Sequence, residues 1–555
     1  MWEIVNFILS IKLPRRSLLV SQPSDKLCRI LDLNSDNWFE EFEQFFLLFV
    51  FSKYLYVEGK MLLSSSIILD VIIILFTSIV FLYLYISRKQ KYFQEKGVYT
   101  PKVQPIFGHF FKMALMKISF SEWLKYYYDT IDKPFFGLYV FDEPLFVIKD
   151  ADLVKKILIK DFNNFMDRNV AAPDHSPLTQ NLMFFQKSPA WKNDRAKTSV
   201  SFTSGRLKSM FPVVQNTMNQ LEKFINENKT IVDAKEVAAL FATDLISQCA
   251  FGIESFCFDK APSIFRAYGR KCFEFSVRNA FAQMMYFFKP DWAAKLKLEF
   301  MPKESMEYFS AAILETMKSR QDTHTFNDLI DIINDLKNKK ELSQDDENLI
   351  VGIPIQFLLA GYETTSTTIS FTLYELAKNV EIQKKVRAEI KNKLKEYGGI
   401  TYETVHDLPY LDMCIYETLR RYPVLPFLDR RCNTDYSIPN SNVVIDKGVG
   451  VLIPLYGLHL DKEIFPDPYT YNPERFRQKF DNSIGSYFVP FGDGPRRCVG
   501  ERFGMISTKT AIITVLLNSE VRVTDKTPAV IKIEPKCFLL NSADPLFLNF
   551  SDISD

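Results

Sequence analysis

Apolar residues in the middle of the chain recur at the spacing of α-helices. Three windows show this periodicity most clearly: 232–251, 347–390 and 410–421. Because a helical period places apolar side chains on one face, these windows predict helices that pack into a core. Runs of β-branched and aromatic residues between turn residues predict short strands in three other windows: 136–148, 443–454 and 530–548. The pattern therefore predicts a mainly α-helical fold with small β-sheets.

A long apolar stretch lies near the N-terminus. Residues 71–86 carry no charge, and Asp70 falls at one end of the stretch. A hydrocarbon layer of ~30 Å needs about 20 apolar residues. Tyrosines and then a basic cluster that begins at Arg88 follow, which is typical of the cytoplasmic side of a membrane. We expect a transmembrane signal-anchor helix over 61–87, with a buried core helix as the alternative.

The anchor divides the chain into four segments. Residues 1–60 mix basic and aromatic stretches in which no domain is evident, so they form an N-terminal extension of unassigned role. Met61 is then a candidate start of the functional chain. Residues 88–108 are a basic connector, and prolines make its second half stiff rather than helical. No repeat or Gly/Ser-rich linker interrupts the remainder, so we expect one large domain over 109–555.

Composition excludes several classes of protein. At ~150 residues per domain, 555 residues would suggest three or four domains, but the lack of linkers favours one. Lys and Arg (68) nearly cancel Asp and Glu (67), so a formal charge of +1 provides no global field for nucleic acid. The 8 cysteines are scattered without a C-x-x-C pair, which favours a reduced compartment. At most one of them is expected to do chemistry.

The segment 491–500, FGDGPRRCVG, singles out Cys498. A helical stretch follows the cysteine, and a helix N-terminus and a nearby arginine lower the pKa of a thiol. Gly494 and Gly500 permit a tight turn and the close approach of a large flat ligand. A thiolate in this setting suits a metal ion. The alternative is a buried free cysteine without chemistry.

The spacing Phe491-x-x-Gly494-x-Arg496-x-Cys498-x-Gly500 resembles the haem-binding loop of the cytochrome P450 family. The resemblance implies a haem b cofactor, with Cys498 as the axial thiolate ligand of its iron and Arg496 paired with a haem propionate. It covers 101–555 and is strongest toward microsomal insect members that metabolise xenobiotics. Three further residues match the family's propionate contacts: Trp191, Arg195 and Arg430. Asp194 departs from the pattern, because a leucine is more usual beside Arg195.

The segment 360–365, AGYETT, lies in an apolar helix. Ala360 and Gly361 are small, and the helical period places them near the acid and alcohol of Glu363 and Thr364. Alone, this string is an ordinary polar kink in a core helix. Beside the cysteine loop it resembles the family's oxygen-binding helix, which implies that the small residues leave a gap for dioxygen and that Thr364 and Glu363 deliver protons. Pro354, two turns earlier, predicts a kink that redirects the pocket roof.

Glu417 and Arg420 are spaced for an ion pair on a helix face, which alone contributes only about 0.2–0.5 kcal/mol. The segment 472–476, NPERF, resembles the family's second arginine segment. The resemblance implies a buried structural triad of Glu417, Arg420 and Arg475 that locks the loop under the haem.

The resemblance implies an oxidoreductase, a haem-thiolate monooxygenase that inserts one oxygen atom from O2 into a lipophilic small molecule. No Gly-rich dinucleotide fingerprint is present, so NADPH electrons are expected from a separate reductase, with cytochrome b5 as a second partner. The expected location is the endoplasmic reticulum membrane, with the domain facing the cytosol. Three basic residues are candidates for reductase docking: Lys192, Lys197 and Arg497. One alternative is a haem-thiolate isomerase or dehydratase acting on hydroperoxides, but Glu363 and Thr364 argue against it because that chemistry needs no proton relay. The other alternative is a non-enzymatic haem sensor.

Five mostly apolar segments are candidate walls of the substrate pocket: 170–185, 262–290, 357–361, 424–427 and 540–543. The second of these is rich in phenylalanine, which indicates a bulky apolar ligand or membrane contact.

Overall fold

The computed structural model describes residues 66–274, 276–320, 328–338, 347–478 and 485–553. The predicted extension 1–60 and the first residues of the predicted anchor lie outside this part. The chain forms two compact units, Met1–Phe81 and Leu82–Asp555. Helix α4 covers Ser66–Lys89. None of the helices in the described ranges combines the length and apolar character needed to cross a membrane.

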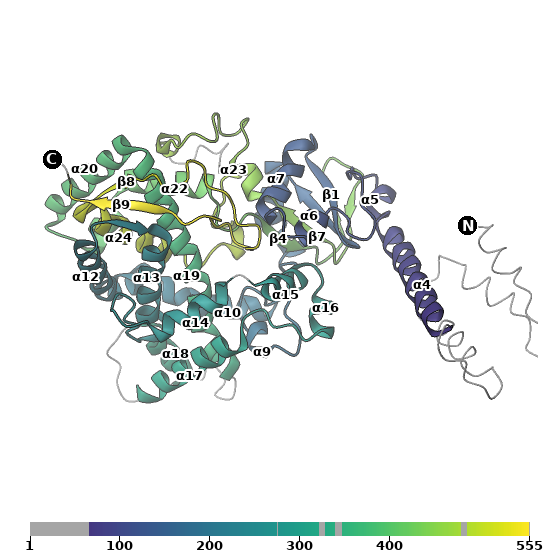
Figure 1. Ribbon diagram of the computed structural model, residues 1–555, viewed down its shortest axis with the longest axis horizontal. Coiled ribbons are helices and arrows are strands. Elements are labelled where there is room, and N and C mark those ends of the chain that lie inside the picture. Colours follow the sequence, from purple (N-terminus) through teal and green to yellow (C-terminus); the bar gives the residue numbers. More distant parts are fainter. Residues whose placement is uncertain (1–65, 275, 321–327, 339–346, 479–484, 554–555) are drawn as a thin grey trace, which may run out of the picture. The chain divides into compact units, whose positions relative to one another are not determined.

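Helices dominate the second unit (Figure 1). Those before the central helix are α5 (Tyr92–Glu95), α6 (Phe111–Ala114), α7 (Phe120–Thr130), α8 (Ala151–Lys155), α9 (Pro177–Gln180), α10 (Ala190–Ser199), α11 (Ser204–Ser209), α12 (Phe211–Glu227), α13 (Ala234–Ile246), α14 (Ile264–Phe273), α15 (Val277–Phe288), α16 (Pro290–Lys295), α17 (Lys303–Ser319) and α18 (Leu329–Asn338). The central helix and those after it are α19 (Glu347–Lys378), α20 (Val380–Tyr397), α21 (Tyr402–His406), α22 (Pro409–Arg421), α23 (Leu455–His459) and α24 (Glu501–Asn518).

Three small sheets complete the unit. The first has the strand order β1-β2-β7-β4, the second β3-β9-β8, and the third pairs β5 with β6. Their bounds are β1 (Phe135–Val140), β2 (Glu143–Ile148), β3 (Ile231–Asp233), β4 (Leu428–Arg431), β5 (Tyr436–Ser437), β6 (Val444–Ile445), β7 (Gly450–Ile453), β8 (Glu520–Val523) and β9 (Phe547–Ser551). The expectation of a mainly helical fold with small sheets is confirmed.

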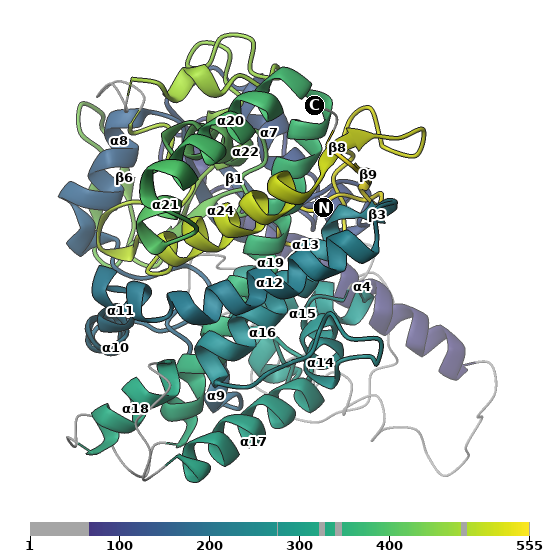
Figure 2. The ribbon, with the colours of Figure 1, turned by 90° about the vertical axis from the view of Figure 1, so that its left-hand side faces the viewer.

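Helix α19 forms the centre of the helical part, where it packs against α13, α22 and α24 (Figure 2). The contact with α13 is close because Gly361 has no side chain: a Cβ there would lie 2.9 Å from Ile246 Cδ1. The helix continues through Pro354 without interruption. This helix carries the 360–365 segment, so the packing of α13 against α19 sets the position of that segment.

Two sequence windows fold differently from the expectation. The periodic window 347–390 contains two helices, because Asn379 adopts a non-helical conformation between α19 and α20. The window 530–548 is largely irregular, with an isolated bridge between Ile533 and Ser542, and β9 begins only at Phe547. Two prolines in this window lack the N–H that a strand ladder needs, which explains the difference.

Candidate active site

The cysteine loop, residues 491–500, is a tight turn in front of α24. The Cys498 N–H donates to the Phe491 carbonyl at 2.8 Å, and the Arg497 N–H donates to the Gly494 carbonyl at 3.0 Å. Gly494 has φ +68°, and a Cβ there would lie 1.9 Å from the carbonyl oxygen of Leu158. The loop therefore requires glycine at this position, both for its left-handed backbone and for the close approach of a second backbone segment.

Two expectations for this loop need correction. Gly500 has φ −88°, and a Cβ there would make only an ordinary contact of 3.5 Å with Phe202, so the turn itself does not require glycine. The Cys498 side chain is exposed to the cavity that it faces, but protein surrounds this cavity, and desolvation raises the pKa of the thiol. The Gly500 N–H and Arg195 act in the opposite direction. The predicted lowering is wrong for the thiol as it stands, because desolvation outweighs both.

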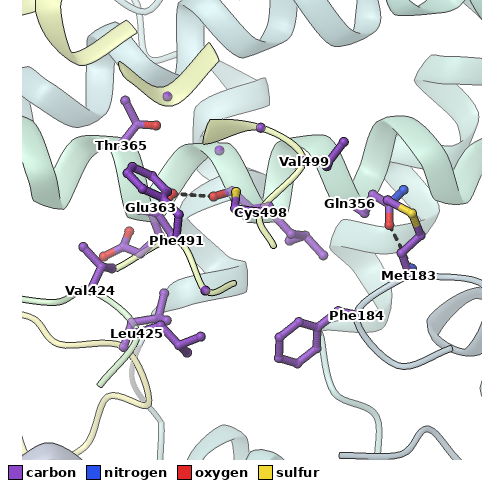
Figure 3. Close-up of a pocket in the computed structure, with 18 of the residues that line it drawn as sticks. Met183, Phe184, Gln356, Glu363, Thr365, Val424, Leu425, Phe491, Cys498 and Val499 are labelled. Atoms are coloured by element: carbon purple, nitrogen blue, oxygen red, sulfur yellow. Dashed lines mark hydrogen bonds between the residues drawn. The ribbon is translucent and has the colours of Figure 1, made fainter. Parts of the chain in front are cut away.

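Cys498 opens onto a cavity of about 440 Å³ (Figure 3). Helix α19 provides one wall of it through Ala360, Gly361, Glu363 and Thr364. All five predicted wall segments contribute lining residues, among them Leu182, Phe273, Phe287, Phe357, Val424 and Asn541. Of the five phenylalanines in 262–290 that the structure describes, however, only Phe273 and Phe287 line the cavity. The apolar walls suit a lipophilic ligand.

Arginines crowd the wall of the cavity around Trp191. Arg496 stacks on the Trp191 ring at 4.0 Å and donates to the carbonyls of Met166 and Gln186 at 2.8 and 3.0 Å. Arg430 is buried, and among the described residues its Nε has no hydrogen-bond partner. Burial, followed by the charge of neighbouring arginines, lowers the pKa of both Arg496 and Arg430 to about 9. Burial also lowers the pKa of Arg195, which lines the same wall.

A fourth arginine of this wall, Arg168, was missed in the sequence. It donates to Asp429 at 3.1 Å, and that buried carboxylate also accepts the N–H groups of Asn169 and Val170. Burial would raise the pKa of Asp429, but Arg168 and Arg430 hold it below its ordinary value. Four arginines thus share the wall with few carboxylates, so it is suited to bind anionic groups. In the sequence, Arg168 is a single arginine in the string DRN and belongs to no motif, so nothing there indicated that it binds an anionic group.

Glu363 and Thr364 both line the cavity, but their side chains bind different partners in the described part of the chain. The Thr364 hydroxyl donates to the Ala360 carbonyl at 2.5 Å. Glu363 accepts from Lys235 at 2.9 Å and from Asn541 at 2.7 Å. Lys235 was not expected from the sequence, and Asn541 was expected only as part of a pocket wall. Gly361 lies against Ile246 on one side, and Ala360 and Gly361 also line the cavity, so the expected gap for dioxygen stays a prediction.

The three residues of the expected triad lie together, but unequally. Glu417 and Arg420 are fully buried and form a bidentate pair at 2.7 and 2.8 Å. Arg420 also donates to the carbonyls of His459 and Pro468. Arg475 lies 3.5 Å from Glu417, its side chain is 14% exposed, and its Nε makes no hydrogen bond in the described residues. The core of this cluster is therefore the Glu417–Arg420 pair.

The remaining candidates are placed as follows. Asp194 is buried and accepts a hydrogen bond from Gln186, whose carbonyl binds Arg496. Arg497 makes a bidentate ion pair with Glu501 at 2.5 and 2.6 Å, so its charge is already engaged. Lys192 is exposed on α10. Lys192 and Arg497 are both exposed, and because the charge of Arg497 is paired with Glu501, Lys192 is the docking candidate that fits best.

A haem fits the donor set of this cavity. The Cys498 thiol provides one soft ligand for a metal. The arginines of the wall, including the Nε of Arg430 that has no partner in the described part of the chain, match two carboxylates of a flat dianionic group. Gly494 allows the loop to turn beneath such a group. The fold and the site together define a haem-thiolate protein.

Comparison with known proteins agrees with this class. A family model described as Cytochrome P450 matches residues 99–550. Cytochrome P450 6k1 of Blattella germanica is 37% identical over 506 residues, which cover 87% of this chain and 97% of that protein. Cytochrome P450 6j1 of the same insect is 35% identical over 499 residues, covering 88% and 99%. Cytochrome P450 6a2 of Drosophila melanogaster is 34% identical over 492 residues, covering 85% and 97%. The chain belongs to the cytochrome P450 family and is an oxidoreductase, a haem monooxygenase.

Proposed function

We propose that this monooxygenase inserts one oxygen atom from O2 into a lipophilic small molecule, with NADPH as the electron source and a separate reductase as the donor. The observation that carries the proposal is the Cys498 loop facing a cavity with apolar walls and a rim of arginines. Cytochrome b5 is a second candidate donor. The exposed Lys192 is the first candidate for the docking surface.

Each group of residues in the site has its own proposed role. Haem, when bound, supplies the activation of dioxygen. Cys498 would hold its iron, and Arg430, Arg496, Arg195 and Trp191 would bind and orient its carboxylates. The apolar walls exclude water from the reacting centre and orient the substrate.

Thr364 and Glu363 are the proposed proton-handling groups. Because the Thr364 hydroxyl gives its hydrogen to Ala360, its oxygen is left as an acceptor at the cavity wall. Glu363 holds or releases a proton at its carboxylate beside it. The Glu417–Arg420 pair is structural in this proposal, because it contacts other protein groups and not the cavity centre.

The experiment is a carbon monoxide difference spectrum of the reduced enzyme, followed by NADPH consumption with added reductase across a panel of lipophilic compounds. Cys498→Ala should abolish the thiolate-type spectrum. Cys537→Ser is a matched control, because Cys537 also lines the cavity but lies outside the loop 491–500. An unchanged spectrum in Cys498→Ala would refute the ligand assignment, and no NADPH consumption with any compound would refute the oxygenase proposal.

We further propose that residues 61–87 anchor the enzyme in the endoplasmic reticulum membrane, with the domain in the cytosol. The support is the uncharged stretch 71–86 and the basic cluster after it. Alkaline carbonate extraction of membranes tests this: the full chain should stay in the pellet, and release into the supernatant would contradict an integral anchor. Peptides from native protein that map upstream of Met61 would contradict a start at that residue.

A further inference from the structure

The direction of the Gln356 amide is fixed by a backbone group. Gln356 lies on α19 and lines the cavity. Its Oε1 accepts the backbone N–H of Met183 at 2.9 Å, as Figure 3 shows. Because a backbone N–H can only donate, the oxygen of this amide must face Met183, and its nitrogen must point the other way.

The segment that contains Met183 is itself held in place. Arg496 donates to the Met183 carbonyl at 3.3 Å and to the Gln186 carbonyl at 3.0 Å. On its other side the segment lies along α19, where a Cβ on Gly352 would be 3.6 Å from the carbonyl oxygen of Asn181. The partner that orients Gln356 is therefore fixed at both ends.

The nitrogen of the same amide is left without an acceptor. In the part of the chain that the structure describes, the Gln356 side chain makes only the hydrogen bond to Met183. Nε2 carries two hydrogens, and an amide donor that leaves water without finding a partner is costly. A ligand with an acceptor removes this cost, whereas a ligand without one leaves the donor unpaired.

The surroundings of Gln356 favour an uncharged ligand. Its neighbours in the lining of the cavity include the apolar Ile353 and Phe357. Phe357 contacts two further rings of the lining, Phe202 at 5.2 Å and Phe503 at 5.0 Å. A neutral amide among apolar groups cannot offset the desolvation of an ion. The donor therefore suits a neutral acceptor, such as the oxygen of a ketone, an ester or an ether.

Gln356 shares a face of α19 with Ala360 and Thr364, because successive members of this set are four residues apart. All three line the cavity. Eight residues of α-helix rise ~12 Å, so the donor lies about two turns before the Thr364 alcohol. A ligand bound at Gln356 therefore leaves Thr364 free and can extend toward it.

We propose that the Gln356 amide is a specificity-determining hydrogen-bond donor, which selects uncharged lipophilic molecules with an acceptor oxygen over plain hydrocarbons of the same shape. The statement that these molecules are substrates rests on the proposed function. The hydrogen bond to a bound ligand does not.

Equilibrium dialysis of the haem-loaded enzyme with fluorenone and with fluorene tests the selection, because these flat molecules differ only in a carbonyl that replaces a methylene. In Gln356→Leu the dissociation constant of fluorenone should rise about two- to tenfold relative to that of fluorene. The ratio is needed because the variant also frees the Met183 N–H, which affects both ligands. Gln215→Leu is the matched control and should keep the ratio of the parent, because Gln215 pairs with Asn219 on the exposed side of α12.

The infrared carbonyl band of bound fluorenone tests the donor in the parent enzyme without any variant. A hydrogen bond weakens the carbonyl bond, so the band should lie at a lower frequency than in hexane. It should return toward the hexane value in Gln356→Leu, or in Gln356→Met if the first variant does not fold.

Three results would overturn the assignment of the donor to Gln356: a band at the hexane frequency in the parent, a band that stays shifted in the variant, or an unchanged ratio of dissociation constants. No binding of fluorenone to the parent would overturn the ligand class. If the parent consumes no NADPH with any compound, the proposed function fails, and the dialysis and infrared results still decide the role of Gln356.

Discussion

The unequal geometry of the buried cluster predicts unequal costs for its three members. Glu417 and Arg420 are completely buried, and Arg420 makes four hydrogen bonds of 2.7–2.8 Å, two of them to Glu417. Glu417→Ala leaves the guanidinium buried without its counter-charge, which typically costs about 3–5 kcal/mol of unfolding free energy. Arg475→Ala removes a partly exposed ion pair at 3.5 Å and one hydrogen bond to Asp467, for which we expect about 1 kcal/mol.

Urea unfolding of the haem-loaded enzyme, followed by far-ultraviolet circular dichroism and by haem absorbance, measures both costs. Glu417→Ala should destabilise by about 2–4 kcal/mol more than Arg475→Ala, as the difference between the two values above requires. The double variant Glu417→Ala/Arg420→Met should cost clearly less than the sum of its single variants, because no charge is left buried alone. Equal losses for Glu417→Ala and Arg475→Ala, or additive costs in the double variant, would refute this description of the cluster.

Three further predictions concern the loop, the arginine wall and pH. Gly494→Ala should lose most of its bound haem, measured by absorbance per protein, whereas the control Gly492→Ala should retain it, because Gly492 has a similar φ of +73° but no atom nearer than 3.7 Å to its Cβ position. Trp191→Phe should release haem to apomyoglobin about two- to thirtyfold faster, since the stack on Arg496 is worth about 0.5–2 kcal/mol. Burial and Arg420 lower the pKa of His459 to about 3, so the unfolded state takes up a proton first as the pH falls below about 6.5. Between pH 6.5 and 5 the parent should therefore lose about 2 kcal/mol of stability, and His459→Gln should lack this part of the slope in urea titrations at both pH values. If stability falls equally with pH in the parent and in His459→Gln, the assignment of this loss to His459 is wrong.

The cysteine loop shows what the sequence could predict. The spacing of Phe491, Gly494, Arg496 and Cys498 is local, and local spacing is enough to specify a turn before a helix. The pKa of Cys498 could not be predicted in this way, because its direction depends on how deeply the loop lies in the folded chain. Helix windows were predicted well where one apolar period continued, and the boundary at Asn379 was missed because the period does not change there.

Contacts between segments that are distant in the sequence could not be predicted from it. Lys235 precedes Glu363 by 128 residues, and Asn541 follows it by 178, so no motif contains the three. Arg168 and Asp429 are 261 residues apart in the sequence. Gly361 was assigned to an oxygen gap from its neighbours in the helix, but its role in packing against Ile246 depends on a second helix. Such roles follow from the topology and not from spacing along the chain.

The positive charges of the arginines that line the cavity couple the binding of haem to the folding of the chain. Arg430 and Arg496, whose pKa values are lowered, are brought close to one another and to Arg168 when the chain folds, and this repulsion opposes folding until a dianion binds. A ligand that binds only the folded chain stabilises it in proportion to the logarithm of its concentration over Kd. The amount of folded enzyme in a cell should therefore follow its supply of haem, and the haem-free chain should be the form that is degraded.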